Sequence, residues 1–210
     1  MSANPTLVWY VSYGSNMCAH RFACYLAGGT PLGASRGQAG CRDSRAPLSA
    51  TAYELAGGIY FATESAVWGG GRAFYDRNLP GAAAARAYLI TSEQFADIVS
   101  QEMHRTIGAN LDLTAVLATG RAELGPGRYE TLLHLGDVGG HPMLTFTAPW
   151  RATDVRWRPP SASYLRILKA GLRETYGWTD YRLGRYLAGL PGARGHWTAA
   201  DIATLPAAPP

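Results

Sequence analysis

The chain has 210 residues, of which 47% are hydrophobic and 25 are glycine, and its formal net charge is +4. A chain of this size can bury the core of one domain without a metal or disulfides, and no apolar run has the length that a bilayer span requires. All basic residues except Lys169 are arginines, scattered from Arg21 to Arg194 instead of gathered along one stripe, which argues against nucleic-acid binding.

Cysteine usage and the N-terminus predict the compartment. The three cysteines, Cys18, Cys24 and Cys41, are an odd number. The N-terminus also lacks the basic stretch and apolar segment of a secretion signal. Both features predict reduced thiols in a cytoplasmic protein. We expect a single domain over residues 1–205, present as a monomer or homodimer, and a frayed tail over residues 206–210.

The first part of the chain predicts a strand, a turn and a short helix. Residues 7–12 (LVWYVS) are β-branched and aromatic, as in a buried strand. The turn YGSN follows, and a helix over residues 17–26 then closes at Gly28. Beyond it, a second strand is expected at 57–63 (GGIYFAT), flanked by two loops at 30–45 and 68–81.

The second part of the chain predicts three strands, at 84–90, 129–135 and 143–147, and three helices, at 92–105, 161–176 and 179–187. Thr91 is the expected N-cap of the first of these helices, and Gln94 completes a capping box. A turn at Gly139 and Gly140 joins the last two strands. Strands and helices do not alternate regularly, so the pattern predicts the α+β class.

The helix that follows Thr91 carries a glutamate on its apolar face. At about 100° per residue, Glu102 lies within about 20° of Phe95, whereas Asp97 points to the opposite side, toward solvent. An unpaired buried carboxylate is costly. Glu102 is therefore either half of an internal ion pair, with Arg86 or Arg105, or a general acid/base. Spacing alone favours neither alternative.

The stretch YVSYGSNM, residues 10–17, resembles the opening strand and turn of the gamma-glutamylcyclotransferase-like proteins. The later motifs of that family follow in order: a Gly-Gly strand (GGIYFAT), a helix ending in SQEM, a tyrosine-bearing strand (RYETLLHL) and the segment PPSASY. The resemblance covers most of residues 7–176. It implies a small, closed, mostly antiparallel β-barrel flanked by helices.

The resemblance also implies an activity that needs no cofactor and no metal. The free α-amine of a small-molecule substrate, a gamma-glutamyl amine or peptide, attacks the substrate's own γ-carbonyl and releases an amine and 5-oxoproline. Glu102 matches the catalytic glutamate, which moves the proton. The implied substrate-binding residues are the turn residues Gly14, Ser15 and Asn16, through their backbone N–H groups, and the pocket tyrosines Tyr13, Tyr129 and Tyr164.

Other functions stay open at this point. An amidohydrolase of the same fold would use water as the nucleophile, and a catalytically silent module would only bind. The loops at 30–45 and 68–81 are expected to rim the pocket, so the leaving amine is undetermined. A thiol hydrolase is disfavoured, because Cys18 and His20 diverge by about 160° on a helix. The dispersed histidines show no zinc-ligand spacing.

Overall fold

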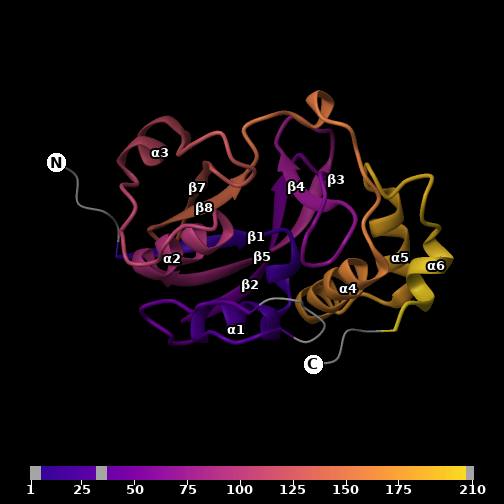
Figure 1. Cartoon of the computed structure of the whole chain (residues 1–210), viewed down its shortest axis with the longest axis horizontal. Helices are drawn as coiled ribbons and strands as arrows, with labels where there is room; N and C mark the ends of the chain where they lie inside the picture. The colour runs from indigo at the N-terminus through magenta and orange to yellow at the C-terminus, as the bar shows by residue number, and fades with distance from the viewer. Residues whose placement is uncertain (1–5, 32–36, 207–210) are drawn as a thin grey trace.

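The computed structural model of the chain describes residues 6–31 and 37–206. Its strands form a six-stranded sheet and a separate two-stranded hairpin (Figure 1). In spatial order, the sheet consists of β2 (Ser49–Ala56), β5 (Ala82–Thr91), β1 (Leu7–Ser12), β8 (His141–Thr147), β7 (Thr131–Val138) and β6 (Arg121–Glu123). The hairpin consists of β3 (Gly58–Ala62) and β4 (Arg72–Asp76).

Strand pairing confirms the mostly antiparallel α+β class. Among the described strands, only β1 and β8 pair in parallel, with Tyr10 opposite Leu144. The hairpin is joined to the large sheet through Thr147 of β8. The Tyr75 N–H donates to Thr147 Oγ1 at 3.1 Å, and this hydroxyl donates to the Tyr75 carbonyl at 2.7 Å. In the described part of the chain, no strand register closes the sheet into a ring, so the closed barrel stays a prediction.

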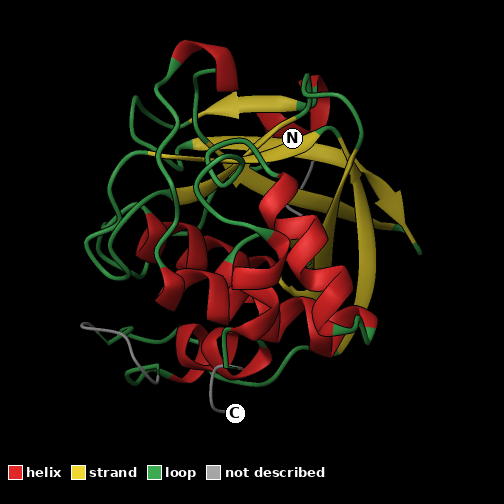
Figure 2. Cartoon of the chain, turned by 90° about the vertical axis from the view of Figure 1, so that its right-hand side faces the viewer, coloured by secondary structure: helices red, strands yellow, loops and turns green. Residues whose placement is uncertain are grey.

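Within the described ranges, six α-helices accompany these strands, most of them on one side of the sheet (Figure 2). They are α1 (Ala19–Ala27), α2 (Ser92–Glu102), α3 (Thr114–Thr119), α4 (Ala162–Tyr176), α5 (Asp180–Gly189) and α6 (Ala199–Thr204). Phe22 of α1 and Phe95 of α2 are buried with Tyr10 of β1 in one core cluster. Leu165 and Leu172 of α4 belong to a second cluster. The core thus lies between the helices and the strands.

The local signals of α2 and α4 are confirmed. Thr91 and Gln94 form the capping box, with each side chain accepting a hydrogen bond from the other residue's backbone N–H, both at 3.0 Å. Helix α4 has Ser161 as its N-cap and ends at Gly177, which adopts a left-handed conformation. However, α2 ends at Glu102 and not near residue 105 as predicted.

The longer of the strands that were not predicted are β4 and β2. β4 lies inside the segment 68–81 that was expected to be a loop, because its five residues are framed by glycine, asparagine and proline. β2 (SATAYELA) is an edge strand with seven of its eight residues not fully buried. It therefore lacks the alternating apolar pattern that sequence reasoning relies on. The short elements α3, β6 and α6 were missed as well.

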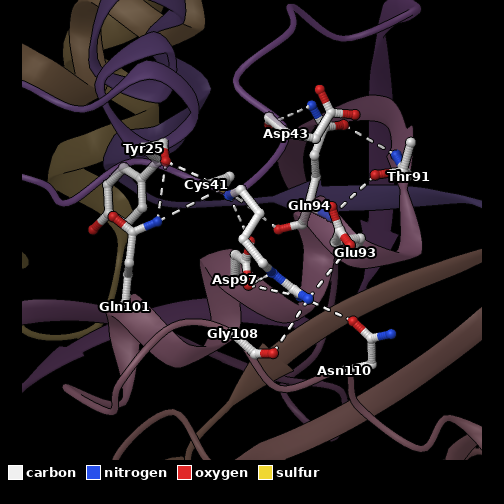
Figure 3. Close-up of polar contacts among 11 residues, drawn as sticks. Tyr25, Cys41, Asp43, Thr91, Glu93, Gln94, Asp97, Gln101, Gly108 and Asn110 are labelled. Atoms are coloured by element: carbon white, nitrogen blue, oxygen red, sulfur yellow. Dashed lines mark hydrogen bonds and ion pairs between the residues drawn. The ribbon is translucent and has the colours of Figure 1, made fainter.

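Asp97 corrects the expected orientation of α2. The prediction placed this residue toward solvent, but its side chain is 0% exposed. The segment that follows residue 37 covers this side of the helix. Arg42 donates to Asp97 through its backbone N–H at 2.8 Å and through Nε at 3.1 Å, and Nη2 lies 3.0 Å from Oδ1 (Figure 3). Both faces of α2 are therefore covered, and the ion pair clamps a neighbouring loop to it.

Lys169 ties the C-terminal helix to α4. Its side chain is 1% exposed, and Nζ donates to the carbonyls of Ile202, Ala203 and Leu205 at 2.7–2.9 Å. It also lies 3.0 Å from an Asp180 carboxylate oxygen. Of the tail expected over residues 206–210, residues 207–210 lie outside the described residues. In the described ranges no helix combines the length and apolar character needed to cross a membrane.

The Arg42–Asp97 ion pair generates a stability prediction. Asp97→Asn removes the buried carboxylate that accepts three donors from Arg42, and we expect it to lower the free energy of unfolding by about 2–3 kcal/mol. Glu93→Gln is the matched control: its carboxylate lies 3.3 Å from the same guanidinium but is 43% exposed. The control should cost less than about 1 kcal/mol. Equal denaturant midpoints for the two variants would contradict the clamp.

Candidate functional site

The turn after β1 is built from the YGSN motif. Ser15–Met17 form a single 3₁₀ turn, closed by hydrogen bonds from the N–H groups of Met17 and Cys18 to the carbonyls of Gly14 and Ser15. Within the described residues, the backbone N–H groups of Gly14, Ser15 and Asn16 have no protein acceptor. They are the unsatisfied donors typical of a helix start, which suit an anion or a carbonyl oxygen.

Helix α4 holds this turn from outside. A Cβ added to Gly171 would lie 2.6 Å from Cys18 N and 2.6 Å from Met17 Cβ, so only glycine allows α4 to come this close. Three residues later, the Glu174 carboxylate accepts the Ala19 N–H at 2.8 Å and thereby caps α1. The same oxygen lies 3.0 Å from Arg86 Nη1, which also donates to the Met17 carbonyl.

The turn lines a cavity of about 340 Å³. The walls come from the turn, α1, the end of α2, the segment before β4, β4 itself, and the residues just before β7 and early in α4. All residues that the sequence singled out line it: Tyr13, Gly14, Ser15, Asn16, Glu102, Tyr129 and Tyr164. Gly37 and Gln38 of the first expected loop line it too, and so do Trp68, Arg72 and Ala73 of the second and Ser65–Val67 just ahead of it.

Glu102 is the last residue of α2 and half-buried. Its Oε1 accepts a hydrogen bond from the Tyr25 hydroxyl at 2.6 Å and lies 3.5 Å from Asn16 Nδ2. The arginines expected as ion-pair partners are engaged elsewhere, Arg86 with Glu174 and Arg105 with Glu130. The carboxylate is therefore held by neutral donors and faces the cavity. A group held in this way can exchange a proton with a bound molecule.

The three tyrosines use their hydroxyls differently. Tyr13 donates to the Phe146 carbonyl at 2.8 Å, and Tyr129 donates to the Ala73 carbonyl at 2.9 Å. Tyr164 instead accepts the Ala73 N–H at 3.3 Å, and no acceptor for its own proton lies among the described residues. Burial raises the pKa of Tyr164 to about 12, so this hydroxyl keeps its proton at neutral pH. Tyr164 can therefore donate into the cavity.

Several cavity residues were not predicted from the sequence, namely Tyr10, Arg21, Tyr25, Trp68, Arg72 and Arg128. Tyr25 and Arg21 lie four residues apart in α1, on one face of the helix. That spacing was visible in the sequence. However, nothing in it indicated that this face meets the end of α2.

Cys18 and His20, the pair that a thiol hydrolase would have used, do not line this cavity. Burial raises the pKa of the Cys18 thiol, whereas His20 is exposed on the surface of α1. The three cysteines form no disulfide. Across residues 6–31 and 37–206, no group of three or more histidine, cysteine or acidic side chains has the geometry to hold a metal ion.

Comparison with solved structures identifies the fold of the chain. No protein-family model matches the chain. An uncharacterised human protein has a similar structure, with a TM-score of 0.52 and 14% identity over 95% of this chain and 99% of its own. A solved gamma-glutamyl cyclotransferase gives a TM-score of 0.51, with 14% identity over 94% of this chain and 98% of its own. The chain has the gamma-glutamyl cyclotransferase fold. This likeness shows the fold alone.

A sequence relative adds a second finding. Over 185 residues the chain is 32% identical to Histone deacetylase 5 of Arabidopsis thaliana. The match covers 80% of this chain and 28% of that protein, so the chain spans less than a third of its relative. A segment similar to this cyclotransferase-fold chain is thus part of a much longer protein.

Within the cyclotransferase fold of this chain, the fit of α4 against the turn can be tested. Gly171→Ala places a methyl group against Cys18 N and Met17 Cβ, and we expect a loss of about 1–3 kcal/mol in the free energy of unfolding. Gly189→Ala in α5 is the control, since a Cβ there meets nothing within 4 Å and alanine favours a helix. An undiminished melting temperature for Gly171→Ala would mean that α4 does not constrain the turn.

Proposed function

We propose that this chain is a gamma-glutamyl cyclotransferase-type enzyme. The substrate's α-amine attacks its own γ-carbonyl carbon, the bond to the leaving nitrogen breaks, and a free amine and 5-oxoproline are released. One observation carries the proposal: a carboxylate, Glu102, faces the same cavity as the free N–H groups of the turn at Gly14–Asn16. The shared fold with a solved gamma-glutamyl cyclotransferase supports it.

Glu102 would move the proton. Its oxygen accepts a proton from the attacking amine as the new C–N bond forms, and passes it to the leaving nitrogen as the old bond breaks. Tyr25, which donates to Glu102 Oε1 at 2.6 Å, keeps the carboxylate oriented during both transfers. Because the nucleophile and the carbonyl belong to one molecule, the enzyme mainly has to hold the substrate folded.

The turn would stabilise the oxyanion that forms on the γ-carbonyl. Backbone N–H groups fixed before the reaction stabilise a developing charge without reorganising. The N–H groups of Gly14, Ser15 and Asn16 meet this requirement, because α4 and Glu174 fix the turn from outside. Of the cavity tyrosines, Tyr164 contributes a donor, while Tyr13 and Tyr129 form walls whose hydroxyls can accept a hydrogen bond from the substrate.

Glu102→Gln tests the proposal. The amide keeps the size and hydrogen-bonding capacity of the side chain but cannot take up the proton, so we expect turnover to fall by about 10²–10⁴-fold with an unchanged melting temperature. Purified protein would be incubated with a panel of gamma-glutamyl amines and peptides, and the products identified by mass spectrometry.

The control is Glu93→Gln on the same helix, whose carboxylate does not line the cavity. It should keep wild-type turnover. Undiminished turnover by Glu102→Gln would rule out the proposed role of Glu102. Free glutamate in place of 5-oxoproline would show that water, and not the α-amine, is the nucleophile, and would overturn the cyclotransferase reaction.

A further inference from the structure

The cavity has an excess of positive charge. Among the described residues, its charged lining groups are the Glu102 carboxylate and the guanidinium groups of Arg21, Arg72 and Arg128. None of these three arginines has a carboxylate oxygen within 4 Å in the described part of the chain, and Glu102 is held by Tyr25. Arg86, a half-buried arginine outside the cavity, does have such a partner in Glu174. The positive charge is therefore available to a bound anion.

Arg21 is the most deeply buried of the three, with 5% of its surface exposed. Its Nε donates to Ser15 Oγ at 2.8 Å, and Nη2 donates to the Tyr25 hydroxyl at 3.3 Å. The guanidinium carbon lies 5.1 Å from the Trp68 ring centroid and 5.4 Å from that of Tyr25. These contacts fix the plane of the group, as expected for a side chain that presents a donor in one direction.

One donor of Arg21 is unused. Nη1 is buried and has no hydrogen-bond partner in the described part of the chain. A buried N–H of a charged group without a partner is costly, so a purely structural arginine would be expected to satisfy it. Since Arg21 lines the cavity, an anionic oxygen bound there would complete its hydrogen bonds.

Tyr25 links this cation to the proposed base. Its hydroxyl accepts from Arg21 Nη2 and donates to Glu102 Oε1, so a single hydroxyl separates the cation from the carboxylate. In an α-amino acid, the carboxylate and the amine are attached to the same carbon. A substrate whose carboxylate binds Arg21 would therefore direct its α-amine toward Glu102, which is the group that has to take the proton.

We infer that Arg21 binds the α-carboxylate of the gamma-glutamyl group through Nη1 and so positions the α-amine beside Glu102. This inference rests on the proposed function. Arg21 of α1 would then select the substrate together with the backbone N–H groups of the turn. Compounds that carry the amide and the amine but lack the α-carboxylate would bind poorly.

Binding of the reaction product tests the assignment without turnover. 5-Oxoproline carries the α-carboxylate, and 2-pyrrolidinone is the same ring without it. Isothermal titration calorimetry should show that the wild type binds 5-oxoproline about ten- to a hundredfold more tightly than 2-pyrrolidinone. Arg21→Met should abolish this preference. Arg21→Lys keeps the positive charge and should retain a part of the preference. It also serves as the test variant if Arg21→Met does not fold.

Arg72→Met is the matched control, since it removes from the same cavity a guanidinium whose Nε is also buried without a partner in the described part of the chain. Unlike Arg21, Arg72 makes no hydrogen bond to Tyr25 there, so its replacement should leave most of the preference. Loss of the preference in Arg72→Met and not in Arg21→Met would overturn the assignment. An unchanged preference in both Arg21 variants would overturn it too. If the wild type releases no 5-oxoproline from any substrate yet binds it through Arg21, the proposed function fails while the anion site stands.

Discussion

The candidate site depends on how closely α4 packs against the turn that follows β1. Tyr164 and Gly171 are seven residues apart and share one face of the helix, with Glu174 close to the same line. Along this face, a tyrosine reaches the cavity, a glycine permits contact with Met17 and a carboxylate caps α1. One helix face thus sets the position of the turn and part of the cavity wall together.

The network inside the cavity follows from that placement. Once the turn and α1 are fixed, Asn16 and Tyr25 reach Glu102, which lies at the end of a helix clamped on its far side by Asp97 and Arg42. The capping box at Thr91 fixes where α2 begins. The contacts of Asn16 and Tyr25 with Glu102, and of Arg42 with Asp97, join segments that are distant in the sequence, so the carboxylate is positioned mainly by tertiary packing.

Much of the fold could be predicted because its signals are local. The apolar strand 7–12, the capping box at Thr91 and the left-handed cap at Gly177 depend on residues within a few positions of one another. β2 could not be predicted in this way, since its alanines and serines become a strand only by pairing with β5. β4 similarly requires β3 as a partner.

The residues of the site also differ in whether local sequence signals or distant contacts determine their place. The helical wheel singled out Glu102, which lines the cavity, but misplaced Asp97, because the loop that covers Asp97 comes from more than 50 residues earlier in the chain. Arg21 was one arginine among many in the sequence. Only the structure shows a buried donor without a partner, and that property depends on which side chains surround it.

The low identity to solved proteins limits what the fold can say about the substrate. At 14% identity, the likeness to the gamma-glutamyl cyclotransferase accounts for the chain path and does not identify the substrate. The charges that a substrate meets, from Glu102, Arg21, Arg72 and Arg128, are therefore the more direct guide to its chemistry. In the described residues, the cavity has one carboxylate and three guanidinium groups without an ion-pair partner, which disfavours a purely cationic amine, because like charges would meet at close range. It favours a substrate that carries carboxylate.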